Sequence, residues 1–181
     1  RLVLCGEAGS GKTALAKRTS FLLSKLRGKA IVQVALSPWD DGLDDLFSSL
    51  LTSLRSKQGT MEGDRLSDIS PREMANRCRS GDRTVAEEIS TLYNGSGAGI
   101  LILDNIDSIT DDRDIAGFCS AIPIGVDAIC TVSGRTSRSA TLQALFERNG
   151  FSIVALEPLG RSEFSGFLHF SLDRTVPESF E

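Results

Sequence analysis

Short apolar runs alternate with amphipathic stretches along most of the chain. The first apolar run, at 2–6, ends in glycine, and residues 13–26 then place leucines at helical spacing. A second pair follows, in which the apolar and β-branched run at 30–36 precedes a stretch at 43–54 that repeats leucine and phenylalanine with a helical period. The pattern predicts a strand, a helix, a second strand and a second helix.

The middle of the chain is more polar than its first third. From Lys57 to about Ser80 the pattern predicts a loop with a short helix near 71–78. A helix is predicted over 84–94, and the glycine-rich segment after it leads into a wholly apolar strand at 100–104. These elements continue the alternation of helices and strands.

The last third contains two more apolar runs, at 128–132 and 151–156, on either side of a helical pattern at 140–148. A last helix is predicted over 161–172. Strands that alternate with helices predict a parallel sheet, and continuous apolar strands predict a sheet covered on both faces. The expected fold class is therefore α/β, with three layers in the order α/β/α around a central, mostly parallel sheet of five strands.

Length and composition limit what this fold does. The chain has 181 residues, 40% of them hydrophobic, which fits one compact domain. Its formal net charge is −4 and its basic residues are scattered, so the charge gives no indication of nucleic-acid binding. No apolar run approaches the roughly 18 residues of a membrane span, and no signal-like segment is present, so we expect a soluble domain without membrane contact.

The two ends of the sequence and its cysteines add to this picture. Because the chain begins inside a strand and ends among polar residues, we expect residues 1–181 to be one domain of a longer multidomain protein. Its four cysteines fit neither a paired zinc-ligand spacing nor a dense disulfide framework, and we expect reduced thiols in a cytoplasmic setting. Trp39 and His169 are interpreted as packing residues. The cysteines are Cys5, Cys78, Cys119 and Cys130.

The sequence GEAGSGKT at 6–13 matches the pattern G-x-x-x-x-G-K-[ST] and lies between a predicted strand and a predicted helix, as this phosphate-binding loop (P-loop) requires. Its glycines permit backbone conformations in which successive N–H groups surround a phosphate. Lys12 is expected to reach the β- and γ-phosphates, and the Thr13 hydroxyl to ligate magnesium. The alternative is a glycine-rich turn with a surface lysine. The expected nucleotide-binding residues are Gly6, Glu7, Ala8, Gly9, Ser10, Gly11, Lys12, Thr13 and Ala14.

The apolar strand at 100–104 ends in Asp104, which is followed by Asn105 and then by a second acid, Asp107. A P-loop needs a second group on the magnesium side at the end of a neighbouring strand, and Asp104 fits that role. The alternative is a helix N-cap or a turn acid after a buried strand. The chain is therefore expected to be a P-loop NTPase with Thr13 and Asp104 on the magnesium side.

Four segments, GEAGSGKT, LILDNID, IPIGVDAICTVSGR and FSIVALEPLGRSEFSGFL, occur in an order and spacing that resemble the signal-transduction ATPases with numerous domains (STAND). This class includes the NACHT and NB-ARC modules of NLR-like receptors, and the resemblance covers nearly the whole chain. The arrangement at 104–107, an acid, a polar residue, a hydrophobe and a second acid, is similar to NACHT proteins, whereas NB-ARC modules more often carry two adjacent acids. The interpretation therefore leans toward NACHT.

The resemblance implies roles for the acids and for an arginine. Asp104 would hold magnesium through its hydration shell, and Asp107 would orient or deprotonate the attacking water, because Asn105 cannot accept a proton. A phosphate-sensing arginine would follow the fourth strand, where Arg135 lies closer to the strand end than Arg138. The alternatives are that Asp107 only caps a turn and that either arginine is a surface residue. The expected catalytic residues are Lys12, Asp104, Asp107 and Arg135.

The function that the resemblance implies is an ATP/ADP switch. ADP would hold a closed form, ATP would favour an open form that self-associates, and slow magnesium-dependent hydrolysis would reset it, with flanking effector and sensor domains as partners. Adenine is favoured over guanine by the resemblance and because the sequence has no Asn-Lys-x-Asp.

Two other functions are open. One is an AAA+ type loader acting on DNA, such as an origin-recognition or transposon-targeting ATPase, although such motors normally carry Glu after the strand acid and bind DNA through a basic face. The other is a small-molecule kinase, whose acceptor pocket is not recognisable in this sequence.

Overall fold

The computed structural model describes residues 1–40, 42–57, 70–133, 139–158 and 160. Its strands are β1 (Leu2–Gly6), β2 (Ala30–Ala35), β3 (Ala98–Asp104), β4 (Asp127–Ser133) and β5 (Ser152–Leu156). Its helices are α1 (Lys12–Arg27), α2 (Leu43–Arg55), α3 (Pro71–Arg79), α4 (Thr84–Ser96), the 3₁₀ helix η1 (Ile106–Ser108), α5 (Asp112–Ala121) and α6 (Ser139–Arg148). The helix predicted at 161–172 lies outside the described residues, as does His169.

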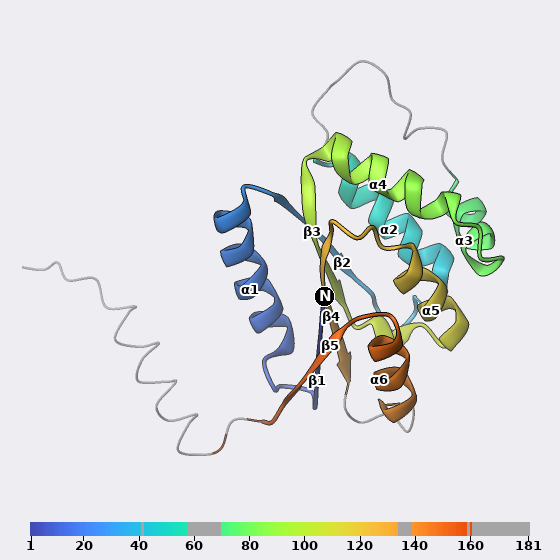
Figure 1. Cartoon of the computed structure of the whole chain (residues 1–181). Helices are drawn as coiled ribbons and strands as arrows, with labels where there is room; N and C mark the ends of the chain where they lie inside the picture. The colour runs from blue at the N-terminus through green and yellow to red at the C-terminus, as the bar shows by residue number, and fades with distance from the viewer. Residues whose placement is uncertain (41, 58–69, 134–138, 159, 161–181) are drawn as a thin grey trace, which may run out of the picture.

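The five strands form one sheet in the order β2-β3-β4-β1-β5, and all four pairings are parallel. Helix α1 lies on one face of this sheet and α2 to α6 lie on the other (Figure 1). The predicted three-layer α/β/α fold around a parallel five-stranded sheet is therefore confirmed. Because the strands are parallel, their carboxyl ends share one edge, where open α/β sheets bind ligands.

The two faces of the sheet are covered unequally. The main core fills the space between the sheet and α2 to α6, and it includes an edge-to-face contact between Phe47 and Phe118, whose ring centroids are 5.5 Å apart. A smaller cluster beneath α1 contains Leu4, Ile102 and Ile129. The larger core thus lies between the sheet and helices α2 to α6, which we call the many-helix layer.

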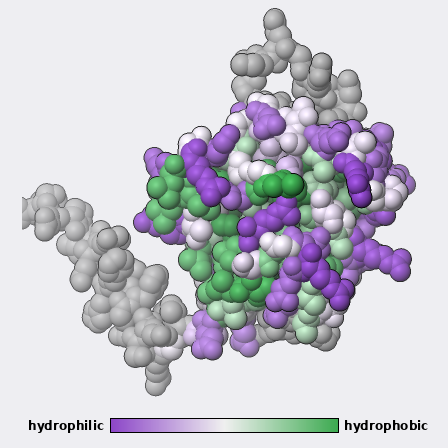
Figure 2. Space-filling view, in the orientation of Figure 1, coloured by the Kyte–Doolittle hydropathy of each residue, from purple (hydrophilic) through white to green (hydrophobic). Residues whose placement is uncertain are grey.

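Helix α1 extends one residue beyond the predicted stretch 13–26 at each end, and among its leucines Leu23 packs partly against the smaller cluster. Ala16 and Ser20 face the sheet and are fully buried, whereas Leu22 is exposed and Leu26 is 82% exposed. Figure 2 shows a group of apolar side chains on the surface in the region of α1. Small residues allow α1 to approach the strands closely, which holds its N-terminus near the end of β1.

Helix α5 is an element that the sequence pattern did not predict. The acidic residues before and inside this helix fit a solvated surface in the sequence, but two of them, Asp111 and Asp114, have defined partners in the structure. Asp111 caps the helix by accepting a hydrogen bond from the Arg113 amide at 2.8 Å. Asp114 is buried and accepts two hydrogen bonds from Arg79 of α3, at 2.8 and 2.9 Å. These contacts join α5 to α3 within the many-helix layer.

The four cysteines are free thiols, as predicted, and the structure places all of them in buried positions. Burial raises the pKa of Cys78 to about 11 and that of Cys119 to about 12, so both thiols stay protonated near neutral pH. These four residues therefore behave as small apolar core side chains.

Trp39 contradicts its predicted role as a packing residue. It is 89% exposed in the turn after β2, which is stabilised by the Ser37 amide donating to the Asp40 carboxylate at 2.6 Å. That turn extends beyond the end of the strand, so the indole has no core to enter.

None of the helices in the described ranges is long and apolar enough to cross a membrane.

Candidate functional site

The loop between β1 and α1 has the backbone of a phosphate-binding loop. Gly9 and Gly11 both have a φ of 83°, a left-handed conformation that residues with a Cβ rarely adopt. Gly11 is also the N-cap of α1, and no side chain caps this helix end. The first amides of α1 and the positive end of its dipole are therefore available to an anion.

Gly6, the first residue of the predicted loop, is constrained by packing. A Cβ at this position would lie 2.4 Å from the backbone oxygen of Leu156 and 2.7 Å from the Ser10 hydroxyl. Glycine therefore allows the loop to approach the end of β5, which pairs directly with β1. This role is additional to the phosphate contact that the motif suggested, and it depends on a strand 150 residues further along the chain.

The Lys12 side chain folds back over its own loop. Its ammonium group donates hydrogen bonds to the backbone oxygens of Gly6 at 2.8 Å and Glu7 at 2.7 Å. Both acceptors are in the loop, so the charge is held at the predicted phosphate site and not in the apolar core. This is the position from which a lysine neutralises a phosphate.

Thr13 and Asp104, the predicted magnesium-side pair, are in direct contact. The Thr13 hydroxyl oxygen lies 2.9 Å from Oδ1 and 3.0 Å from Oδ2 of Asp104, which is only 6% exposed. Thr13 is in the first turn of α1 and Asp104 is the last residue of β3. A hydroxyl and a carboxylate are the hard oxygen donors that Mg²⁺ prefers, so the residues present fit this ion.

The described part of the chain holds no group of three or more His, Cys, Asp or Glu side chains that could hold a metal ion. Mg²⁺ is commonly bound through one or two protein oxygens, with water and substrate phosphates completing its shell. The Thr13–Asp104 pair is consistent with that sparse kind of site.

Asp107 lies at the same edge of the sheet because η1 follows β3 directly. Its Oδ2 accepts a hydrogen bond from the Ser133 amide at the end of β4, at 3.1 Å. The pKa of the Cys5 thiol is raised, mainly by burial, and the negative charge of Asp107 contributes to this rise. A hydrogen bond with Gln143 acts in the opposite direction. Ser133 pairs with Gly6 in the sheet, so Asp107 lies near the start of the loop, and its catalytic role stays a prediction.

Asn105 shapes the turn between the two acids. It has a φ of 59° and is the one non-glycine residue with a positive φ among those described. Its side-chain amide donates to the backbone oxygen of Leu36 at 3.2 Å, and its backbone amide donates to the Thr131 hydroxyl at 2.9 Å. Asn tolerates this conformation better than most residues. The sequence indicated only that Asn105 cannot act as a base and gave no sign that it holds the turn after β3.

Thr131 is a second residue that the sequence analysis missed. Its hydroxyl lies 2.5 Å from Oδ1 of Asp104. A single polar residue in the apolar run AICTV was the available signal. The two arginines predicted as phosphate sensors, Arg135 and Arg138, lie outside the described residues.

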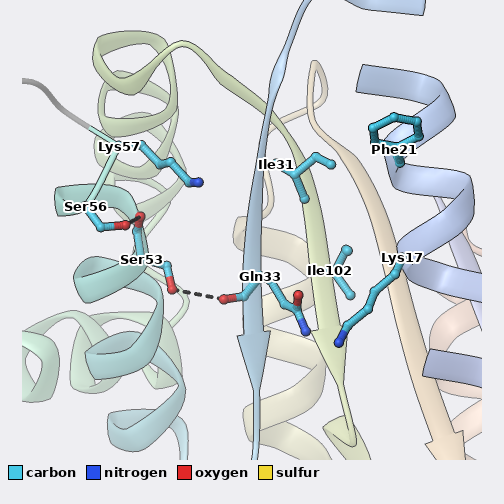
Figure 3. Close-up of a pocket in the computed structure, with 8 residues that line it drawn as sticks. All are labelled: Lys17, Phe21, Ile31, Gln33, Ser53, Ser56, Lys57 and Ile102. Carbon is cyan, nitrogen blue, oxygen red and sulfur yellow. Dashed lines mark hydrogen bonds between the residues drawn. The ribbon is translucent and has the colours of Figure 1, made fainter. Parts of the chain in front are cut away.

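A separate cavity of about 460 Å³ lies between α1, β2 and the end of α2 (Figure 3). Lys17 and Phe21 of α1 line one side of it, and Ser53 of α2 lines the other, where its hydroxyl donates to the Gln33 backbone oxygen at 2.9 Å. None of the residues at 6–14 lines this cavity. It is therefore distinct from the loop site.

Comparison with known proteins adds little to this description. No protein-family model matches the sequence, and no match is found among curated proteins. Among solved structures, the Pif1 helicase from Candida albicans is similar, with 16% sequence identity and a TM-score of 0.46. The match covers 98% of this chain, and the chain spans 41% of that helicase chain. At this level of similarity the comparison carries no functional argument.

The geometry itself defines the class of site. A strand, a loop with two left-handed glycines, a helix start, a lysine over the loop and a hydroxyl–carboxylate pair are brought together at one sheet edge. This is the arrangement of a P-loop with its neighbouring strand acid. No comparison separates NACHT or NB-ARC modules from other P-loop proteins.

Proposed function

We propose that this chain binds ATP or ADP with Mg²⁺ at residues 6–14 and serves as the nucleotide switch of a signal-transduction ATPase. The observation that carries the proposal is the contact between the Thr13 hydroxyl and the Asp104 carboxylate, 91 residues apart in sequence. A hydroxyl and an acid meet beside a phosphate-binding loop when both serve the same cation.

Each group in the loop has a defined task in phosphate binding. The amides of the loop and of the first turn of α1 bind phosphate oxygens. Lys12 exchanges its two backbone acceptors for phosphate oxygens, which are better partners because they are charged. The exchange keeps the ammonium group hydrogen-bonded in both states.

Thr13 and Asp104 complete the cation side of the site. An ionised carboxylate only accepts hydrogen bonds, so the Thr13 hydroxyl proton is directed at Asp104 and its oxygen lone pairs are left for a cation. Bound magnesium would neutralise the charge that develops on the phosphoryl oxygens. The protein contribution is to hold these two oxygen donors next to the loop.

Hydrolysis is proposed to be slow. Asn105 cannot accept a proton, and its side chain is already bonded to the Leu36 backbone oxygen. Asp107 is the remaining acid near the loop, and one of its oxygens is held by the Ser133 amide. Weak activation of water suits a domain that retains its nucleotide for a long time. By resemblance to STAND proteins, Arg135 would be the residue that senses the terminal phosphate.

The switch itself extends the proposal beyond the site. By resemblance to STAND proteins, with a preference for NACHT, ADP favours a closed form and ATP an open form that self-associates in the cytoplasm. Flanking effector and sensor domains would transmit and receive the signal. The nucleotide site is the element that distinguishes the two forms, since its phosphate contacts differ between ATP and ADP.

Titration calorimetry with ATP and ADP, with and without magnesium, tests the proposal. We expect saturable binding of both nucleotides and a gain in ATP affinity when magnesium is added. Light scattering in the same solutions would report self-association with ATP. Absence of binding to either nucleotide would contradict the proposal, and hydrolysis stimulated by DNA would favour a DNA-acting loader instead.

A further inference from the structure

Thr131 is a polar residue in a strand that is otherwise apolar at its centre. It is fully buried, and its neighbours Cys130 and Val132 belong to the main core. Valine has nearly the same shape and suits a buried strand. Burying a hydroxyl without a partner is unfavourable. A threonine here therefore indicates a use for its hydroxyl group.

The hydroxyl of Thr131 makes two hydrogen bonds whose directions are determined. The Asn105 amide donates to it at 2.9 Å, because an N–H group only donates. The Thr131 proton is then directed at Oδ1 of Asp104, 2.5 Å away, because an ionised carboxylate only accepts. A short O–H hydrogen bond to a carboxylate is among the stronger hydrogen bonds in proteins.

These bonds constrain the magnesium-side acid from β4, the strand that pairs with β3. Thr13 of α1 lies within hydrogen-bond distance of both carboxylate oxygens of Asp104, whereas Thr131 of β4 contacts Oδ1. Thr131 thereby sets which oxygen faces β4 and limits rotation of the carboxylate. The same hydroxyl holds the Asn105 amide at the start of the turn that leads to Asp107.

We propose that Thr131 is a positioning residue for the cation site, acting through Asp104. The inference rests on the proposed function, because it assigns Thr131 a role toward the magnesium that Thr13 and Asp104 hold. Thr131 itself is fully buried, and its contact with the proposed cation site is through the Asp104 carboxylate. Groups that hydrogen-bond to metal-side carboxylates typically alter metal affinity about 10- to 100-fold when removed.

Two substitutions separate the hydroxyl from the shape of the side chain. Thr131→Val keeps the shape and removes the hydroxyl, and Thr131→Ser keeps the hydroxyl. The measurement is ATP affinity by calorimetry over a series of magnesium concentrations. We expect Thr131→Val to raise the magnesium concentration needed for half of the affinity gain by about 10- to 100-fold. Thr131→Ser should stay within a few fold of the parent, and ADP affinity without magnesium should be unchanged in both.

A control addresses the general effect of losing a buried hydroxyl. Ser20 of α1 is fully buried, and its hydroxyl has no hydrogen-bond partner in the structure. Ser20→Ala should therefore leave magnesium dependence as in the parent. When Asp104→Asn is already present, Thr131→Val should have no further effect on magnesium dependence. The reason is that Thr131 acts through the Asp104 carboxylate, which the first substitution removes.

The outcomes distinguish this inference from the proposed function. If the parent shows no magnesium-dependent nucleotide binding, both the proposed function and the inferred role of Thr131 are contradicted. If the parent binds as expected but Thr131→Val has parental magnesium dependence, or Thr131→Ser loses as much as Thr131→Val, the inference alone is overturned. A loss of metal-free ADP affinity would also overturn it, since the damage would not be specific to the cation. Should the valine variant not fold, Thr131→Ala also removes the hydroxyl and is compared with Thr131→Ser in the same way.

Discussion

The side-chain amide of Asn105 donates a hydrogen bond to the backbone oxygen of Leu36, 3.2 Å away, and ties the turn after β3 to the end of β2. Asn105 has a φ of 59°, which a longer side chain adopts less readily. The residue directly after the strand acid is therefore occupied in holding the turn. A carboxylate placed there would have to give up this contact before it could reach a phosphate.

Asn105→Glu tests whether position 105 shapes the turn or controls the chemistry. We expect the free energy of unfolding to fall by roughly 1–3 kcal/mol, from the left-handed backbone and the lost hydrogen bond. Single-turnover ATP hydrolysis should not accelerate. Asn105→Gly is the control, since it relieves the backbone but loses the same hydrogen bond, and urea unfolding should place it between parent and Asn105→Glu. Faster hydrolysis by Asn105→Glu would contradict this account.

Lys12→Ala should weaken binding of both ATP and ADP while leaving the fold intact, because among the described residues the hydrogen-bond partners of the Lys12 ammonium are two loop carbonyls. Loss of a charged hydrogen bond typically corresponds to about 1.5–3 kcal/mol, or roughly 10- to 150-fold in affinity. Calorimetry measures the change. Lys17→Ala, on the same helix but at the separate cavity, is the matched control. Equal affinities in the two variants would remove Lys12 from the site.

Asp104→Asn should remove the magnesium-dependent part of ATP affinity and leave ADP binding without magnesium largely unchanged. An amide is a much weaker ligand for a hard cation than a carboxylate, although its oxygen still accepts a hydrogen bond from Thr13. The measurement is ATP affinity against magnesium concentration. The idea fails if the variant and the parent respond to magnesium alike.

Asp107→Asn should slow single-turnover ATP hydrolysis without weakening nucleotide binding. A general base typically contributes about 10² to 10⁴ in rate, so the loss should fall in that range if Asp107 activates the water. Asp127→Asn is the control, because Asp127 is the first residue of β4, at the opposite end of that strand from the Ser133 amide that holds Asp107. A parental rate in Asp107→Asn would leave Asp107 as a turn acid only.

Asp114→Ala should destabilise the many-helix layer. Asp114 is buried and bonded to Arg79 through both oxygens, and Arg79 would keep its weaker contact with Asp44 at 3.1 Å. Because Arg79 remains partly exposed, we expect a loss of about 1–3 kcal/mol in the free energy of unfolding. Asp44→Ala, at the exposed partner, should cost about 0–1 kcal/mol. Chemical denaturation compares them, and equal losses would contradict the difference in burial.

Local chemistry in the sequence determined the elements and the loop. Apolar runs and helical spacing depend only on neighbouring residues, and they placed all five strands correctly and most of the helices. The pattern at 6–13 required a turn of glycines between a strand and a helix, and Gly9 and Gly11 have the left-handed backbone that such a turn needs. The free state of the cysteines likewise followed from their spacing, whereas the burial of all four is seen only in the structure.

Tertiary structure decided which of these residues meet. The contact of Thr13 with Asp104 depends on α1 packing across β3, and that of Gly6 with Leu156 depends on β5 pairing with β1. Helix α5 escaped prediction because its short acidic start looks like a solvated surface until Arg79 is placed beside it. Strand order, long-range pairing and burial are set by the packing of the whole chain, so no local pattern carries them.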